Sequence, residues 1–112
     1  LRGRQERLGV ADSYRVQAVI AGRAGRETEA EQYFEESLSV CDEIGGKLQE
    51  AECRRDYAVF LSQVDRIEEA RLHLELAHGS FIDLQASEHA ADVQRLLDDL
   101  DSAPVVEEER AA

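Results

Sequence analysis

The sequence is poor in basic residues and in proline. The first shortage argues against proteins that bind nucleic acids or anionic membranes, and the second excludes helices broken by proline. Its 13 Lys and Arg are outnumbered by 25 Asp and Glu, so the net charge is −12. Binding of DNA or RNA without sequence preference needs a basic face, as does binding to an anionic membrane surface. No apolar run approaches the roughly 20 residues that span a bilayer. The single proline, Pro104, lies near the C-terminus and interrupts no helix upstream.

Cysteine is also scarce, and the two cysteines, Cys41 and Cys53, are too few for a disulfide framework. They lie on opposite sides of Gly45-Gly46 at different distances from that turn, so we expect both thiols to stay reduced. Reduced thiols and the lack of a signal-peptide pattern favour a cytoplasmic protein. The chain starts at Leu1 rather than at methionine, and we interpret it as a segment of a longer protein.

What the sequence does contain is an internal repeat with a period of 40 residues. Residues 26–37 recur as residues 66–77, and the match is strongest at small or apolar positions. These positions pair Ala30 with Ala70, Phe34 with Leu74, Ser37 with Ala77, Cys41 with Phe81, and Ile44 with Leu84. Their spacing of four, three, four and three places them on one face of a helix. A fixed period of this length indicates a repeat architecture.

The repeat predicts five helices, in two hairpins and a last helix that is apolar on one side only. They span residues 11–22, 27–44, 48–63, 66–84 and 87–100. Asp65, with Glu68 three residues later, matches a capping box at the start of the fourth helix. We therefore predict an all-α fold, an α-solenoid of antiparallel helix hairpins with two repeats and a C-terminal capping helix.

The predicted domain organisation follows from these helices. A truncated helix end or linker comes first and a disordered acidic tail comes last, with one helical repeat domain between them. The ranges are residues 1–10 for the helix end, 11–101 for the domain and 102–112 for the tail. Within the domain, the first repeat is 11–46, the second is 47–85 and the capping helix is 86–101.

The residues around the second turn resemble a tetratricopeptide repeat. The pattern consists of Ile44-Gly45-Gly46, Glu50-Ala51, Ala58, Glu69-Ala70, Leu74 and Ala77. It is similar to the 40-residue variant of that family, which occurs in GoLoco-binding polarity adaptors and in bacterial regulatory or sensor modules. Gly46 departs from the family pattern, in which Asp is usual there. The resemblance covers about residues 11–101 and implies an interaction scaffold, in which the first helices of the hairpins line a groove for a peptide or helix.

Six charged residues on these first helices are candidates for partner binding. Arg15, Arg55 and Arg95 recur every 40 residues, and each follows an acid by three positions: Asp12, Glu52 and Asp92. The resemblance places them toward the groove, where three guanidiniums would bind carboxylates of a partner through paired hydrogen bonds. Alternatively, the six residues form only i,i+3 salt bridges on a solvated surface. Val19 and Val59, in register on the same face, either form the apolar floor of the groove or pack between helices.

No group of residues has the spacing of a catalytic, metal or cofactor site. His73 and His78 are five residues apart and therefore point in different directions from a helix, and His89 has no Cys or second His nearby. The paired carboxylates suit solvated helix faces, and Gly45-Gly46-Lys47 lacks the length and the Ser or Thr of a phosphate-binding loop. We therefore expect no enzymatic activity, no cofactor and no metal.

Two functions of different classes follow. The first is a protein–protein interaction scaffold that binds a peptide or helix of a partner through the groove, where the arginines hold acidic groups of that partner. The alternative is a structural or self-association segment of a larger bacterial signalling or transcription-regulatory protein, in which the chain forms a homo-oligomer. Two repeats are fewer than the three or so that a stable stack usually needs, and this favours the alternative.

Overall fold

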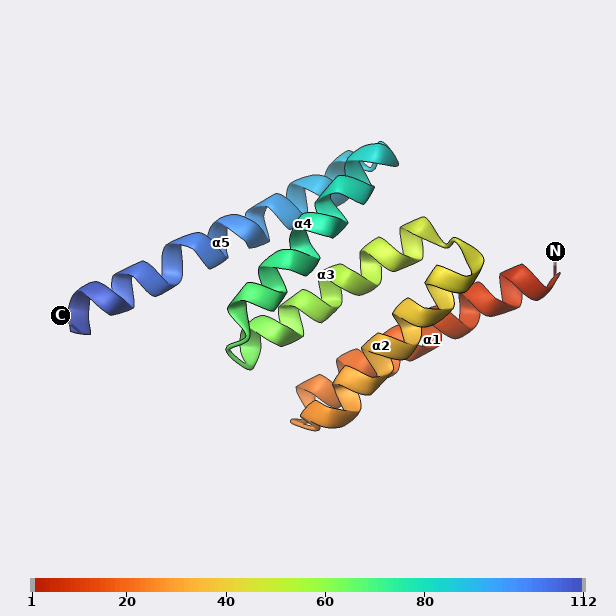
Figure 1. Cartoon of the computed structure of the whole chain (residues 1–112), viewed down its shortest axis with the longest axis horizontal. Coiled ribbons are helices and arrows are strands. Elements are labelled where there is room, and N and C mark those ends of the chain that lie inside the picture. The colour runs from red at the N-terminus through yellow and green to blue at the C-terminus, as the bar shows by residue number, and fades with distance from the viewer. Residues whose placement is uncertain (1, 112) are drawn as a thin grey trace.

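The computed structural model describes residues 2–111, and the side chains of residues 3–102 among them. It contains five α-helices (Figure 1): α1 (Arg2–Arg23), α2 (Glu27–Ile44), α3 (Lys47–Gln63), α4 (Ile67–Asp83) and α5 (Ser87–Ala111). The described residues include no β-strand. The predicted all-α class is therefore confirmed.

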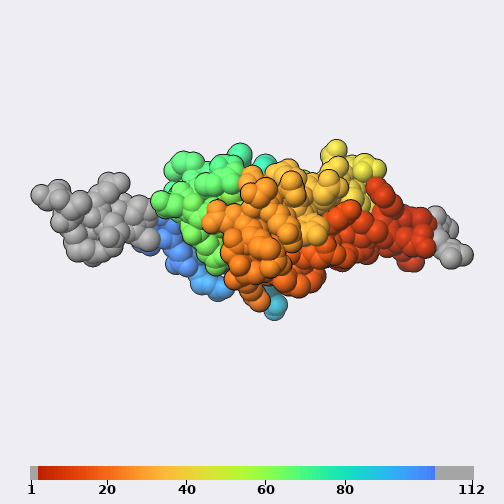
Figure 2. All heavy atoms as spheres, turned by 90° about the horizontal axis from the view of Figure 1, so that it is seen from below, coloured from red at the N-terminus to blue at the C-terminus, as the bar shows by residue number. Residues whose placement is uncertain are grey.

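The helices form a row in which each packs on the next. The helix α1 packs on α2, α3 packs on α4, and α5 packs on α4, while α3 also contacts both helices of the first hairpin. Figure 1 shows the α1–α2 pair, the α3–α4 pair and α5 following one another along the molecule. In the space-filling view of Figure 2, α2 lies over the centre of the surface, with α1 extending to one side. This arrangement is the predicted solenoid of helix hairpins.

The repeated apolar positions form the core. Four of the five predicted pairs are at most 2% exposed: Ala30 with Ala70, Phe34 with Leu74, Ser37 with Ala77, and Cys41 with Phe81. The fifth pair does not belong to it, because Ile44 is half-buried and Leu84 is 40% exposed. Both residues lie where their helix ends, and no further turn of helix covers them there.

Aromatic rings join the two hairpins. Phe34 of α2 stacks on Tyr57 of α3 with ring centroids 4.7 Å apart, and Phe60 contacts the ring of Phe34 at 5.9 Å. Gly22 of α1 lets the Phe60 ring lie close to the first hairpin, because a Cβ at that position would lie 3.1 Å from the ring. The hydroxyl of Ser37, which is buried, donates a hydrogen bond to the carbonyl oxygen of Ala11 at 2.8 Å. The repeat therefore places one polar residue in the core together with its partner.

The turns between helices keep the 40-residue period in their backbone angles. Gly25 and Asp65 have φ of 81° and 68°, and Gly45 and Gln85 have φ of 70° and 59°. The predicted capping box at Asp65 is wrong, since the N-cap of α4 is Arg66 and no side chain caps it. Asp65 instead ends α3 in the left-handed conformation, and the N–H of Arg66 bonds the carbonyl of Leu61 at 2.9 Å. This is the pattern of a Schellman helix end.

The first and last helices are longer than the sequence predicts. Residues 2–10, which we interpreted as a helix end or linker, continue α1. They pack beside the end of α2, where Arg7 pairs with Glu43 at 3.0 Å and Leu8 lies against Gly46. The helix α5 extends past residue 101 to Ala111 and so runs through the segment predicted as a tail. The side chains of residues 103–112 lie outside those that the structure describes, so their solvated, acidic character stays a prediction.

Both cysteines are buried and neither forms a disulfide, as the sequence predicts. Burial raises the pKa of the Cys41 thiol to about 11 and that of the Cys53 thiol to about 12. The Cys53 sulfur lies 3.7 Å from the carbonyl oxygen of Phe34, to which its S–H donates. Both residues therefore act as small packing residues in the core.

Candidate functional site

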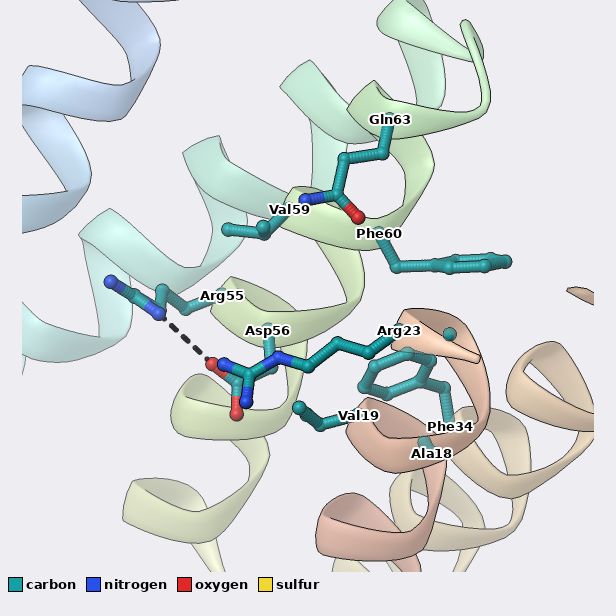
Figure 3. Close-up of a pocket in the computed structure, with 10 residues that line it drawn as sticks. Ala18, Val19, Arg23, Phe34, Arg55, Asp56, Val59, Phe60 and Gln63 are labelled. Carbon is teal, nitrogen blue, oxygen red and sulfur yellow. Dashed lines mark hydrogen bonds and ion pairs between the residues drawn. The ribbon is translucent and has the colours of Figure 1, made fainter. Parts of the chain in front are cut away.

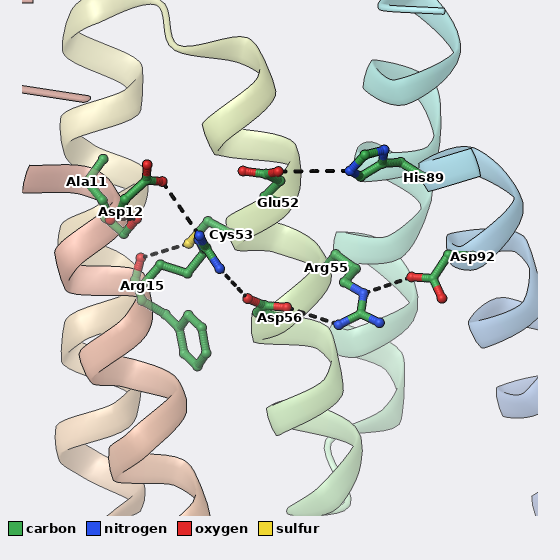
Figure 4. Close-up of polar contacts among 11 residues, drawn as sticks. Ala11, Asp12, Arg15, Glu52, Cys53, Arg55, Asp56, His89 and Asp92 are labelled. Atoms are coloured by element: carbon green, nitrogen blue, oxygen red, sulfur yellow. Dashed lines mark hydrogen bonds and ion pairs between the residues drawn. The ribbon is translucent and has the colours of Figure 1, made fainter. Parts of the chain in front are cut away.

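The three arginines that recur every 40 residues lie on alternate helices, α1, α3 and α5. Figure 4 shows that Asp56 connects Arg15 with Arg55 and that Arg55 also contacts Asp92. Arg15 donates to Asp56 at 2.9 Å, and Arg55 donates to Asp56 at 3.1 Å and to Asp92 at 2.9 Å. Arg95 pairs with Asp92 in turn. We call this chain of contacts the ion-pair row; it consists of Arg15, Asp56, Arg55, Asp92 and Arg95. The row crosses from the first hairpin to the last helix.

Asp56 is the central member of the row, and sequence reasoning missed it. Its carboxylate accepts one hydrogen bond from α1 and one from its own helix, and its side chain is only 17% exposed. The positions 40 residues before and after it are Val16 and Leu96, so the period that revealed the arginines carries no signal at Asp56. The available signal was an acid directly after Arg55 in the sequence.

The three predicted acids take different partners. Asp12 lies 3.7 Å from Arg15, and Asp92 pairs with Arg95, so two of the three predicted i,i+3 pairs form. Glu52 does not pair with Arg55; among the described side chains, the ring of His89 lies 3.9 Å from its carboxylate. Arg55 turns instead toward Asp56 and Asp92, because both offer hydrogen bonds at about 3 Å.

The ion-pair row is electrostatically balanced rather than basic. Burial lowers the pKa of Arg15, but its hydrogen bond to Asp56 and the nearby carboxylates outweigh that effect, and its pKa is raised. The pKa of Arg55 is raised in the same way by Asp92 and Asp56. Counting the predicted acids, three guanidiniums face four carboxylates. Two buried atoms here, Nε of Arg15 and Oδ1 of Asp12, have no hydrogen-bond partner within the described residues.

The two predicted valines lie beside the row, at the wall of a cavity between α1 and α3 (Figure 3). This cavity has a volume of about 110 Å³, and Val19, Val59 and Phe60 supply its apolar wall. Arg23, Arg55 and Gln63 supply its polar rim. Both valines are half-buried, so each also packs between helices.

A second cavity of about 180 Å³ lies on the other side of Val59. Its lining comes from α3, α4 and α5 and includes Val59, Leu74, Leu96 and Leu100. A third cavity of about 250 Å³ is lined by members of the row together with Glu52, His89 and Phe81. The first cavity shares Val59 with the second, and Arg55 and Asp56 with the third, so the three occupy one continuous surface of α1, α3 and α5. We call it the α1–α3–α5 surface.

The histidines lie apart from one another. His73 packs on the ring of Tyr57, with centroids 4.7 Å apart, and its Nδ1 lies 2.9 Å from a guanidinium nitrogen of Arg54. Burial and the Arg54 charge lower the pKa of His73. His89 packs on Phe81 at 4.9 Å. Among the side chains that the structure describes, those of residues 3–102, no three His, Cys, Asp or Glu residues come close enough together to hold a metal ion.

Over the described part of the chain, none of the five helices combines the length and the apolar character needed to cross a bilayer.

Comparison with known families agrees with this architecture. Residues 9–81, which include both hairpins up to the last buried residue of α4, match the model of a family described as tetratricopeptide repeat. No curated protein and no solved structure is significantly similar to the chain. Members of the matched family generally act as scaffolds for protein–protein interaction. With a 40-residue period, two helix hairpins packed in a row and a family match over most of its length, the chain belongs to the tetratricopeptide repeat family.

Proposed function

We propose that the α1–α3–α5 surface binds a peptide or helix of a partner protein. The observation that carries this proposal is the pair of cavities on either side of Val59, with the ion-pair row beside them. Volumes of about 110 and 180 Å³ are smaller than the roughly 300 Å³ at which pockets for small molecules begin. They suit single side chains of a larger ligand.

The arrangement of the cavities constrains the partner. One lies between α1 and α3 and the other between α3 and α5, so they are separated by about one helix-to-helix distance, roughly 10 Å. A partner helix reaches both with side chains seven residues apart, because its rise is about 1.5 Å per residue. The proposed ligand is therefore a segment with two apolar side chains about two helical turns apart.

The arginines give the ligand its charge preference. The proposed partner-binding residues are those predicted from the sequence, Arg15, Arg55, Arg95, Asp12, Glu52, Asp92, Val19 and Val59. Arg95 is the most open of the three arginines, with a side chain that is 68% exposed, and Arg23 at the cavity rim is also exposed. A carboxylate of the partner meets guanidinium N–H groups there at little desolvation cost, whereas Arg15 and Arg55 are held by Asp56.

Affinity capture with three variants tests the proposal. The first replaces Val19 and Val59 by Thr, which keeps their shape and puts a hydroxyl in each cavity. The second replaces Arg23 and Arg95 by Ala, and the control replaces Arg26, an exposed arginine with an i,i+3 pair to Glu29. All are compared with the wild type in a lysate of the source organism, after circular dichroism has confirmed equal helix content.

The expected result is a protein retained by the wild type and the Arg26 control but lost from the valine variant. Capture by the Arg23 and Arg95 variant should be weaker, and the difference should shrink at high salt, since the contact is ionic and exposed. Equal capture by all four forms would contradict binding at this surface.

A second function, self-association as a segment of a larger bacterial regulatory protein, is favoured by one feature of α1. Val16 and Ile20 are 48% and 56% exposed and lie one turn apart. Their counterparts in the second repeat are Asp56 and Phe60, and Phe60 is buried against the first hairpin. A second copy would cover Ile20 in the same way. Sedimentation at several concentrations tests this: the wild type should dimerise and Ile20→Glu should not.

The 40-residue variant of the family remains part of this proposal. Left-handed turn residues 40 positions apart, Gly25 with Asp65 and Gly45 with Gln85, support it.

A further inference from the structure

The outer side of α4 carries an apolar stripe that the rest of the fold does not use. Leu72 is 56% exposed, Leu76 is 46% exposed and Ile82 is 55% exposed, and Gly79 between them is exposed as well. Spacings of four, three and three residues place all four on one side of the helix. The opposite side of α4 buries Leu74 and Phe81 in the core. We call Leu72, Leu76, Gly79 and Ile82 the α4 stripe.

The first repeat is an internal control for this stripe. Forty residues earlier, the equivalent positions of α2 are Gln32, Glu36, Ser39 and Asp42, and all four are exposed. The polar residues in α2 show that packing of the hairpins needs no apolar side chain at these positions. The α4 stripe is therefore an apolar surface that packing of the repeat does not account for, and such contiguous surfaces mark interaction sites.

Gly79 is a second unusual feature of the same stripe. It lies inside α4, where glycine is among the least favourable residues, and φ is not in the left-handed region. A Cβ at this position would meet no atom within 4 Å, so packing inside the chain does not require glycine either. What glycine does provide is bare backbone between Leu76 and Ile82, which a helix from another molecule can approach closely.

The charges around the stripe select the kind of molecule. Three acids border it, Glu68, Glu75 and Asp83, and the side chains of Glu68 and Asp83 are 88% and 68% exposed. Their cationic contacts are long, 3.8 Å from Glu68 to Arg71 and 3.7 Å from Asp83 to Lys47. A second copy of the chain, with net charge −12, would bring like charges to this border. A ligand with Lys or Arg beside its apolar residues is attracted instead.

We propose that the α4 stripe is a docking site for an amphipathic helix of another protein, one with an apolar ridge flanked by basic residues. The site is on α4, whereas the proposed function uses the surface of α1, α3 and α5, so the chain holds two partners at once and bridges them. Leucine-type side chains of the ligand pack between Leu72, Leu76 and Ile82, its backbone crosses at Gly79, and its basic residues pair with Glu68, Glu75 and Asp83.

Two synthetic helical peptides test the docking site in solution. Both have about 18 residues with leucines every third or fourth position along one side. In the first, lysines flank the leucines, and in the second, glutamates replace those lysines. Each is titrated by fluorescence anisotropy against the full chain, against L72Q/L76E and against V19T/V59T. The substitutions L72Q and L76E copy the residues that the first repeat carries at these positions, so they suit a helix of this fold.

The lysine peptide should bind the wild type and V19T/V59T equally, and L72Q/L76E at least about tenfold more weakly. This comparison is stringent because L72Q/L76E is more acidic than the wild type, so attraction by charge alone predicts tighter binding to the variant. The glutamate peptide should bind the wild type at least about tenfold more weakly than the lysine peptide. Gly79→Ala should weaken binding of the lysine peptide several-fold while it raises the thermal stability of the chain.

Four results would overturn the proposal. The first is equal affinity of the lysine peptide for the wild type and L72Q/L76E, and the second is no binding to the wild type. The third is a wild-type dimer in sedimentation that L72Q/L76E abolishes, which assigns the stripe to a second copy. Loss of binding in V19T/V59T alone would place the peptide on the α1–α3–α5 surface and so reject the α4 stripe without affecting the proposed function.

Discussion

The ring of Phe34 lies nearly parallel to that of Tyr57, with an angle of 11° between their planes and 4.7 Å between their centroids. This stack joins α2 to α3, and Phe34 is fully buried. Phe34→Ala should lower the free energy of unfolding by about 3–5 kcal/mol, because it removes the ring and leaves a cavity. Phe34→Leu, which copies Leu74 of the second repeat, should cost about 1–2 kcal/mol.

Denaturant unfolding followed by circular dichroism measures both changes. Absence of any loss in Phe34→Leu would show that the stacked ring contributes nothing beyond an apolar side chain.

Asp56 should matter more to stability than Glu52, although only Glu52 was predicted as a site residue. Asp56→Ala removes hydrogen bonds to two guanidiniums and leaves Arg15 partly buried without them, so we expect a loss of about 2 kcal/mol. Glu52→Ala removes only a contact of 3.9 Å to His89, and we expect a change within about 0.5 kcal/mol. Urea denaturation of the two variants makes the comparison, and equal losses would contradict the central position of Asp56.

Stability should decrease as the pH falls through about 6.5, the ordinary pKa of histidine, because of His73. Burial and the neighbouring Arg54 lower the pKa of His73 in the folded chain. Between that lowered value and about 6.5, the unfolded chain binds a proton that the folded chain does not, and this favours unfolding. The loss is complete once the pH is below the folded pKa. The contribution of His73 is fully present above about 6.5.

The variant His73→Gln isolates this effect, since Gln offers an oxygen to Arg54 but does not titrate. Thermal unfolding between pH 8 and pH 5 should show a steeper decrease in Tm for the wild type than for His73→Gln. Parallel curves would assign the pH dependence to other groups.

Two glycines should respond to alanine in opposite directions. Gly79→Ala should stabilise the chain by about 0.5–1 kcal/mol, because Gly79 is helical and a Cβ there meets nothing. Gly25→Ala should destabilise it, because Gly25 has φ of 81°, a conformation that a residue with a Cβ rarely adopts. Differential scanning calorimetry of the two variants gives both signs, and a stabilising Gly25→Ala would contradict the left-handed turn.

The thiols should be inert in the folded state. Burial raises the pKa of Cys53 to about 12 and that of Cys41 to about 11, so almost no thiolate exists at pH 8. Reaction with a disulfide reagent should be slow in buffer and fast in denaturant. Fast reaction of one thiol in buffer would show that its helix opens locally.

The repeat made most of the fold predictable, because a helix that buries the same face twice leaves the same pattern twice in the sequence. Ala30, Phe34 and their counterparts were recognised in this way. The pattern could not show where equivalent residues of the two repeats differ in burial or in backbone conformation. Leu84, at the end of its helix, is exposed, although Ile44 at the equivalent position is half-buried. Asp65 ends α3 with a positive φ, a backbone conformation at which glycine would be expected in the sequence.

The three arginines of the charged site were predictable from the repeat, but Asp56 and the contacts between the helices were not. Register brought Arg15, Arg55 and Arg95 together correctly, since residues 40 apart share a face. Which carboxylate each arginine contacts depends on the distances between α1, α3 and α5, and the sequence does not specify these distances. Asp56 reaches both neighbouring guanidiniums from α3, and Glu52, one turn earlier on the same helix, does not.

The contacts that join the two hairpins differ in how strongly salt weakens them. The stack of Phe34 on Tyr57 is apolar and insensitive to salt, whereas the bond of Asp56 to Arg15 is ionic and partly exposed. Rising ionic strength should therefore weaken the contact of Arg15 with Asp56 while it leaves the stack of Phe34 on Tyr57 unchanged. We expect the angle between the two hairpins, and with it the curvature of this short superhelix, to depend on ionic strength while the helix content stays constant.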